Sequence, residues 1–279
     1  MIDVLLATYR PDPDMLREQV DSIRSQRDVD VNLIRREDEE GAGAAANFSA
    51  LLAESKAPYV AFSDQDDVWH VDKLARMMEC MSDLESRYGR DTPALVFCDS
   101  VVTDAELRPL PGTFLSRQRV DVVRGLSLSR LLLQNFIAGN LMLFNAALRE
   151  KAGEVPSAAL MHDSWLAIVA AAFGRIGFVD APLLDYRQHG ANVIGATAAD
   201  AAHCGRRARE GVPAFRARLS ANIAQAAAFV DRFGGASPEC VRALANFPRI
   251  GYLGRRAAIF RHGLFKQGVL RNLALVLFA

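Results

Sequence analysis

The chain has 279 residues, which is long enough for one large domain, with or without a small appendage, around a hydrophobic core. Apolar residues make up 51% of the chain, which excludes an intrinsically disordered protein. The net charge is zero, but residues 203–279 carry 13 Lys and Arg against 3 Asp and Glu, so the first 202 residues are acidic overall. Such a basic tail favours contact with an anionic surface, either phospholipid or nucleic acid.

Strands and helices alternate through the first hundred residues. "DVLLATY" predicts a buried parallel strand, and "PDPDMLREQVDSIRSQ" predicts a helix capped by Asp12 with Pro13 at its first position. The elements expected next are the strand "VDVNLI" (29–34), the helix "AAANFSALLAES", the strand "PYVAFSD", the helix "DKLARMMECMSDLESRY" and the strand "ALVFCD". This alternation predicts an α/β domain with a mostly parallel sheet.

The second half of the chain is less regular. "LSRLLLQNF" predicts a helix, "NLMLFN" a strand, and "DSWLAIVAAAFG" a helix closed by Gly174. "IGFVD" and "LLDYRQH" read as two closing strands. After about Gly190 the alternation stops, and an apolar helical stripe follows, made of Phe215, Leu219, Ile223, Ala226, Val230 and Phe233.

The segment "FSDQDDVW" places three carboxylates, Asp64, Asp66 and Asp67, directly after an apolar strand. Ligands of open α/β sheets bind beyond the carboxyl ends of the strands, so a divalent cation bound to a diphosphate would relieve the repulsion between these carboxylates. The alternative is that the carboxylates cap the N–H groups at the start of the next helix. For an isolated D-x-D-D the second interpretation has more weight.

The flanking segments change that balance, because together they resemble the family 2 glycosyltransferases of GT-A fold. Within the family they are most similar to the bacterial rhamnosyltransferase-type branch that builds O-antigen and related polysaccharides. The similarity spans about residues 3 to 197. Six ordered segments carry it: "LLATYRP" with "LREQVDSIRSQ", "GAGAAANFSALL", "YVAFSDQDDVWHVDKL", "FIAGNLMLFNAAL", "MHDSWLAIVAAAFG" and "LLDYRQHGANVIGA".

This resemblance implies a Rossmann-like GT-A domain over residues 1–199 and a helical, basic extension over residues 200–279. It also implies a nucleotide-diphosphate sugar lying across the carboxyl edge of the sheet. Asp64 and Asp66 would hold a divalent metal, Mn²⁺ or Mg²⁺, on the diphosphate, with Asp66 the more direct ligand. Asp67 would orient the loop or cap the next helix.

Other roles follow from the same resemblance. Trp69 would wall the sugar pocket, or would be a core residue. Lys73 would face the diphosphate, or would pair with a nearby aspartate. His189 would complete the metal shell, and Arg187 would contact the diphosphate. Further donor-binding candidates are Thr8, Tyr9, Arg10, Asp38 and Asn47.

The general base of an inverting transfer is implied to be a carboxylate in a short acidic motif at a helix start. "HDSW" fits that description and points to Asp163, which could equally be the N-cap of its helix. Acceptor-binding candidates are Gly139, Asn140 and Trp165, with glycine allowing close backbone approach in "AGN".

One family feature is absent. A D-D-G-S-type motif normally follows the second strand, but only about 20 residues separate "SIRSQ" from "AAANF", and they contain no such motif. Either "VDVNLI" is the second strand and Asp38 inherits the contact with the nucleotide base, or that strand and its helix are missing. The second case would favour a non-catalytic glycan-assembly protein descended from a transferase.

We therefore expect an inverting, metal-dependent glycosyltransferase acting on a hydroxyl of a growing polysaccharide or lipid-linked glycan, with L-rhamnose as the first expectation for the sugar. The composition favours a cytoplasmic protein, peripheral on the inner face of the membrane through its basic tail, rather than a nucleic-acid-binding one. The alternative for the tail is a helical cap whose arginines face water. A phosphohydrolase would need further carboxylates for a second metal, and no persuasive set is present.

Overall fold

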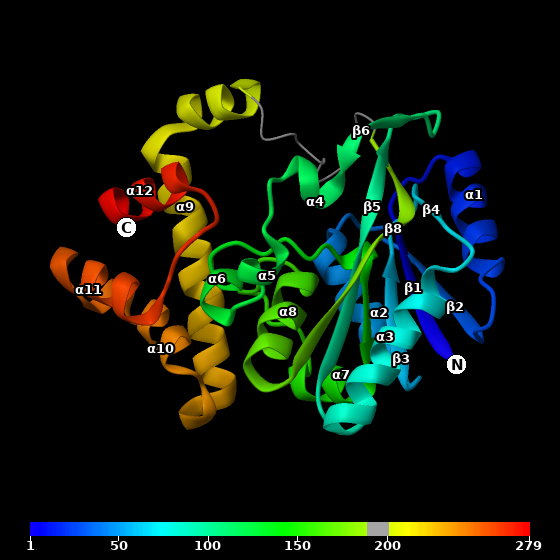
Figure 1. Cartoon of the computed structure of the whole chain (residues 1–279), viewed down its shortest axis with the longest axis horizontal. Coiled ribbons are helices and arrows are strands. Elements are labelled where there is room, and N and C mark those ends of the chain that lie inside the picture. The colour runs from blue at the N-terminus through cyan, green and yellow to red at the C-terminus, as the bar shows by residue number, and fades with distance from the viewer. Residues whose placement is uncertain (189–200) are drawn as a thin grey trace.

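The structure is a computed structural model that describes residues 1–188 and 201–279; within residues 201–210 it describes the helix but not the side chains. A curled sheet lies at the centre of the α/β part, and a group of C-terminal helices lies to one side of it (Figure 1). The strands are β1 (Ile2–Thr8), β2 (Val31–Glu37), β3 (Tyr59–Ser63), β4 (Val68–Trp69), β5 (Ala94–Thr103), β6 (Pro109–Thr113), β7 (Met142–Asn145) and β8 (Arg175–Arg187).

The α-helices flank this sheet and form the C-terminal group. They are α1 (Pro13–Arg24), α2 (Ala44–Glu54), α3 (Lys73–Tyr88), α4 (Phe114–Arg117), α5 (Val122–Gly125), α6 (Leu128–Leu131), α7 (Ala146–Ala152), α8 (His162–Phe173), α9 (Ala201–Phe233), α10 (Glu239–Ala245), α11 (Tyr252–His262) and α12 (Val269–Phe278). The long helix α9 is bent at Gly211, whose φ of 65° is not helical.

The strand order is β2-β1-β3-β7-β5-β8-β4, with β6 paired to β5. The strands β1, β2 and β3 pair in parallel, and β5 and β8 also pair in parallel. Because β7 is antiparallel to both β3 and β5, those two parallel groups run in the same direction, with β7 inserted between them. The mostly parallel sheet predicted from the sequence is therefore confirmed, and the structure adds the antiparallel strands β4, β6 and β7.

The first half of the chain follows the sequence closely. The Asp12 carboxylate accepts hydrogen bonds from the backbone amides of Asp14 and Met15, at 2.9 and 3.1 Å, so the predicted cap of α1 is confirmed. The strand β2 pairs with β1 over its full length, from Val31 opposite Ile2 to Glu37 opposite Thr8.

Three expectations for the second half need correction. The two closing strands form one strand, β8, because the long strand β5 pairs with both halves. Of two register shifts between them, the first passes over Asp180 and Ala181, and Pro182 is then paired with Asp99. The helix expected at "LSRLLLQNF" is the single turn α6. The helix α8 begins at His162, one residue before Asp163, and its N-cap is Met161.

The hydrophobic core continues from the sheet into the C-terminal helices. The predicted stripe on α9 packs against it, with Leu219 and Ala226 buried. The ring of Trp165 on α8 stacks on that of Phe233 and meets the edge of Phe229, both on α9. The C-terminal helices therefore hold α8 against the sheet. None of the described helices combines the length and apolar character that crossing a membrane requires.

Candidate active site

A cleft of about 1270 Å³ opens where β1, β2 and β3 end. The carboxyl ends of these parallel strands meet at one edge of the sheet, which is the usual ligand position in such folds. Residues just beyond each of the three strands line the cleft, and so does the start of α8. Its opposite wall comes from residues 133–140 and from the C-terminal helices.

The three carboxylates of the acidic cluster do not point the same way. Asp64 and Asp66 line the cleft, whereas Asp67 is fully buried. The Asp67 carboxylate accepts a 2.6 Å hydrogen bond from the side-chain amide of Asn140 and a 3.3 Å bond from the backbone N–H of Arg187. The cluster thus presents two carboxylates to a ligand and uses the third to fix the loop.

Negative charge accumulates on the cleft side of this loop. Burial, together with the nearby charges of Asp66 and Asp163, raises the pKa of Asp64 to about 7, although Lys73 opposes the shift. A cation bound here would offset this repulsion. The described residues contain no group of three or more His, Cys, Asp or Glu side chains that could hold a metal. Two hard carboxylate oxygens fit Mg²⁺ or Mn²⁺ when diphosphate and water supply the other ligands.

Lys73 and Trp69 lie in the core beneath the acidic loop. The ammonium of Lys73 donates a 2.7 Å hydrogen bond to the backbone carbonyl of Asn140 and lies 3.4 Å from the ring centroid of Trp69. Its burial lowers the pKa of Lys73 to about 8. Neither side chain lines the cleft, so the donor contacts suggested by the sequence are not supported by this geometry. Both side chains therefore belong to the core on which the acidic loop packs.

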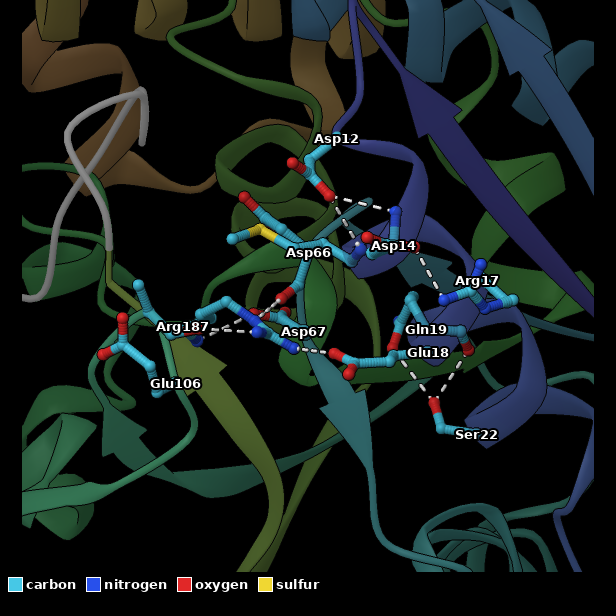
Figure 2. Close-up of polar contacts among 12 residues, drawn as sticks. Asp12, Asp14, Arg17, Glu18, Gln19, Ser22, Asp66, Asp67, Glu106 and Arg187 are labelled. Carbon is cyan, nitrogen blue, oxygen red and sulfur yellow. Dashed lines mark hydrogen bonds and ion pairs between the residues drawn. The ribbon is translucent and has the colours of Figure 1, made fainter.

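Arg187 does not line the cleft either, and its guanidinium points toward Glu18 (Figure 2). Its guanidinium donates to the backbone carbonyls of Asp66 and Ala105, at 2.9 and 2.6 Å, and forms an ion pair with Glu18 of α1. Only 4% of Arg187 is exposed. The arginine therefore clamps the backbone of the acidic loop to α1, and the diphosphate contact expected for it has no geometric support.

Asp163 lines the cleft from the first turn of α8. Burial raises its pKa to about 6, while hydrogen bonds from the backbone amides of Ser164 and Gly139 act in the opposite direction. The side-chain amide of Asn135 lies 3.5 Å from the same carboxylate. A carboxylate with this pKa is mostly ionised near neutral pH and is basic enough to accept a proton from a hydroxyl.

The acceptor-side candidates have different surroundings. Gly139 and Asn140 line the cleft, although Asn140 is largely buried and holds both Asp67 and Lys73. Trp165 is fully buried, and its indole N–H donates to the carbonyl of Ala152. A direct contact between Trp165 and an acceptor is therefore not supported, because this ring belongs to the contact with α9.

The donor-side candidates from the first two strands do meet at the cleft. Thr8, Tyr9, Arg10, Asp38 and Asn47 all line it. The Asp38 carboxylate accepts hydrogen bonds from the amides of Ala42 and Gly43, which lowers its pKa.

Two side chains fix this wall. The side-chain amide of Asn47 donates to the carbonyls of Thr8 and Arg36, tying α2 to both strands. Gln65 was not singled out by the sequence, but its side-chain oxygen accepts the backbone N–H of Tyr9 at 2.8 Å. Since β2 directly borders β1 and Asp38 follows it into the cleft, the geometry favours the first of the two interpretations of the shortened segment.

Other cleft residues were missed. His162 and Phe48 line the cleft, and so do Arg218 of α9, Arg271 of α12 and Lys266, which lies between α11 and α12. The apolar stripe of α9 predicts that this helix packs against the core. The sequence holds no signal that residues of the C-terminal helices border the cleft. His189, the third metal ligand expected, lies outside the described residues.

Comparisons with known proteins agree with this architecture. The sequence profile described as glycosyl transferase family 2 matches residues 11–88, from α1 to α3. Among solved structures, the chain is similar to the mannosyltransferase PcManGT from Pyrobaculum calidifontis in complex with GDP-Man and Mn²⁺. The two share 18% identity with a TM-score of 0.52, covering 99% of this chain and 78% of that one.

Two structures of S. aureus TarS 1–349 are similar as well. The complex with UDP has 10% identity and a TM-score of 0.53, covering 95% of this chain and 72% of that one. The complex with UDP-GlcNAc has 13% identity and a TM-score of 0.50, covering 95% and 92%. The match spans 60% and 53% of two further TarS chains. At these identities the similarity establishes the fold. No curated protein matches the chain.

Proposed function

Because residues 11–88 match the glycosyl transferase family 2 profile, we propose that the chain transfers a sugar from a nucleotide-diphosphate donor to a hydroxyl group of a glycan acceptor, with inversion at the sugar carbon. One observation carries the proposal. Asp64 and Asp66 line the same cleft as Asp163, and the charge of Asp163 raises the pKa of Asp64. A diphosphate-binding pair and a base thus border one space large enough for a nucleotide sugar.

In this proposal Asp163 is the catalytic base. It would accept the proton of the acceptor hydroxyl as the oxygen attacks the sugar carbon from the face opposite the diphosphate. The bond from the sugar to the diphosphate breaks in the same step, and the nucleoside diphosphate leaves. Asn135 and the amide of Ser164 orient the carboxylate.

Asp64 and Asp66 would hold a divalent cation, Mn²⁺ or Mg²⁺, against the diphosphate. When bound, that cation supplies charge neutralisation for the departing diphosphate. The PcManGT complex contains Mn²⁺, which supports metal use within this fold. His189 remains a proposed further ligand.

The nucleotide would lie along the donor wall formed by residues 8–10, Asp38 and Asn47. The similar structures hold a guanosine or a uridine nucleotide, so they support a diphosphate nucleotide without choosing its base. An L-rhamnosyl donor remains the first proposal for the sugar, on the rhamnosyltransferase-type segments alone. Gly139 and Asn140 would border the acceptor, a growing polysaccharide or lipid-linked glycan.

We also propose the division suggested by the sequence, with the transferase domain in residues 1–199 and a helical extension in residues 200–279. The extension completes the acceptor side of the cleft through Lys266 and Arg271.

The same extension supports peripheral contact with an anionic membrane, which would place the protein at the inner face of the cytoplasmic membrane. Val269, Leu270, Leu273 and Leu277 are 53–76% exposed, and they share one face of α12 opposite the buried Leu275. No Asp or Glu follows Glu239, whereas seven Arg and Lys do. An aliphatic face surrounded by cations suits the interface of an anionic bilayer.

Co-sedimentation with vesicles tests the membrane proposal. The protein should bind phosphatidylglycerol vesicles and not phosphatidylcholine vesicles, and Leu270→Ser with Leu273→Ser should abolish binding. Val71→Ser, at an exposed valine on another part of the chain, is the matched control. Dimerisation that depends on the two leucines, without vesicle binding, would assign the face to a second copy of the chain instead.

Calorimetric titration tests the transferase proposal. Wild-type protein is titrated with dTDP, UDP and GDP, each with and without Mn²⁺, and the series is repeated on Asp66→Ala. Glu150→Ala is the control, because Glu150 is an exposed carboxylate on α7 that does not line the cleft. We expect one nucleotide to bind only with metal and Asp66→Ala alone to lose it. If no nucleotide binds, the non-catalytic alternative replaces the transferase.

A further inference from the structure

The charged residues that line the cleft differ between its two sides. On the donor side they include the carboxylates that follow β2 and β3, alongside Arg10. Among the described lining residues from α9 onward, three are cations, Arg218, Lys266 and Arg271, and none is a carboxylate. The acceptor hydroxyl is neutral when it arrives, so the transfer proposed above gives these three cations no task.

Arg218 borders the cleft from a face of α9 that is fixed against the opposite wall. Ala221 and Asn222, three and four residues further along the helix, line the cleft too, so the three residues share one face. The side-chain amide of Asn222 donates a 3.1 Å hydrogen bond to the backbone carbonyl of Leu133, on the wall formed by residues 133–140. This bond sets the rotation of α9 that brings Arg218 to the cleft.

Lys266 is held in place through its backbone. Its N–H donates to the side-chain oxygen of Asn272 at 2.7 Å, and its carbonyl accepts from the amide of the same side chain at 2.8 Å. The next residue, Gln267, donates its N–H to the side chain of Gln134 on the cleft wall, at 2.9 Å. The ammonium of Lys266 lies 5.4 Å from the ring centroid of Phe215, which precedes the cleft-lining arginine of α9 by three residues. The lysine therefore lies beside that arginine's face of the helix.

Arg271 projects from the inward face of α12. It precedes the fully buried Leu275 by four residues, so the two side chains leave the helix on the same side. Its guanidinium donates a 3.4 Å hydrogen bond to the carbonyl of Gln267. The exposed leucines of α12 lie on the other face. The helix thus turns a cation toward the cleft and an aliphatic surface outward.

These cations keep surface that a ligand can reach, because Arg218 is exposed and Lys266 and Arg271 are half-buried. Three positive charges around one space repel one another unless an anion lies between them. A phosphate group suits them best, because it offers several acceptor oxygens to the fork of an arginine and to the point charge of a lysine. The donor diphosphate is already assigned to the cation at Asp64 and Asp66, so this anion belongs to the other substrate.

We propose that Arg218, Lys266 and Arg271 bind a phosphate group carried by the acceptor and so bring its hydroxyl to Asp163. This inference rests on the proposed transferase function. Two kinds of acceptor contain such a group: a glycan on a lipid phosphate, and a polymer linked by phosphodiesters. The aliphatic outer face of α12 favours the lipid phosphate, because the same helix carries Arg271.

Calorimetry with phosphate probes tests the subsite. The protein is first saturated with Mn²⁺ and the nucleoside diphosphate that wild type binds, which fills the donor side. It is then titrated with geranyl phosphate, with a glycerol phosphate oligomer, or with geraniol. The test variant is Lys266→Gln with Arg271→Gln. The matched control, Arg249→Gln with Arg261→Gln, removes the same charge at exposed positions that do not line the cleft. Tm is measured for every protein.

Wild type should bind a phosphate probe and should not bind geraniol. The test variant should weaken that binding at least about 10-fold, the usual effect of losing one charge-assisted hydrogen bond. The control variant should bind as wild type does, and all three proteins should have the same affinity for the nucleoside diphosphate. Binding of geranyl phosphate alone identifies a lipid phosphate, and binding of the oligomer alone identifies a phosphodiester polymer; both outcomes support the subsite.

Three results would overturn the inference while the transferase function stands. In the first, wild type binds nucleotide but neither phosphate probe, or binds geraniol equally well. In the second, the test variant binds the probe no more weakly than the control variant. In the third, the test variant loses nucleotide affinity to the same extent, because the cations would then serve the donor diphosphate. If wild type binds no nucleoside diphosphate at all, the transferase proposal fails, and this inference falls with it.

Discussion

Replacing Arg187 by methionine distinguishes a structural clamp from a substrate ligand. The guanidinium is 4% exposed and donates to the carbonyls of Asp66 and Ala105, at 2.9 and 2.6 Å (Figure 2). Hydrogen bonds from a charged donor contribute about 1.5–3 kcal/mol each to stability. The ion pair with Glu18 adds at most about 1 kcal/mol, because the carboxylate is 48% exposed.

We therefore expect Arg187→Met to lower the free energy of unfolding by about 3–6 kcal/mol. The methionine keeps the aliphatic stem, so little of this loss reflects a cavity. Glu18→Gln should cost less than about 1 kcal/mol, because it removes only the half-exposed pair. Urea unfolding followed by circular dichroism measures both variants against wild type.

Measuring nucleotide binding tests the alternative, in which Arg187 contacts the diphosphate. If Arg187 contacts the diphosphate, Arg187→Met should weaken metal-dependent nucleotide binding while the unfolding midpoint stays near that of wild type. A stability change below about 1 kcal/mol would refute the clamp, since two charge-assisted hydrogen bonds could not then be formed.

Further predictions concern the proposed base, Asp163, and one glycine. Asp163→Asn should lower kcat about 100- to 10,000-fold while nucleotide affinity, measured by calorimetry, stays unchanged; wild-type kcat would contradict the assignment of the base. The proposed base must be ionised, and the pKa of Asp163 is about 6, so log kcat/KM should fall with a slope of one as the pH drops below about 6. A fall that begins only near pH 4 would show that another group is responsible. Gly174→Ala should destabilise the protein by roughly 3 kcal/mol in urea unfolding, because its Cβ would lie 1.8 Å from the carbonyl oxygen of Pro93; Gly235→Ala, with nothing within 4 Å, is the neutral control.

Local signals predicted the elements and the chemical character of the cleft. The cap at Asp12, the strand before the acidic cluster and the helix after it depend on residues close in sequence, and the structure has them. The positions of Asp64, Asp66 and Asp163 at one cleft also follow, because strand ends and helix starts gather at one edge of such a sheet.

Burial was much harder to predict, because it depends on segments far apart in the chain. Trp69 and Lys73 belong to the same motif as Asp66, yet they are fully covered, Lys73 by bonding to a carbonyl 67 residues away. Arg187 forms its ion pair with Glu18, which lies near the opposite end of the α/β part in the sequence. Trp165 is buried because α9 packs against α8, a contact that no periodicity within α8 could reveal.

The cleft also divides by chain position. In the proposed transferase, the donor wall is built within the first 66 residues, whereas the acceptor wall comes from residues 133–140 and from α9 and α12. Changes in the late part of the chain can therefore alter which acceptor fits without disturbing the residues that hold the nucleotide. For protein engineering, this makes the C-terminal helices an exchangeable selectivity module, provided that the ring contacts of α9 with Trp165 are retained.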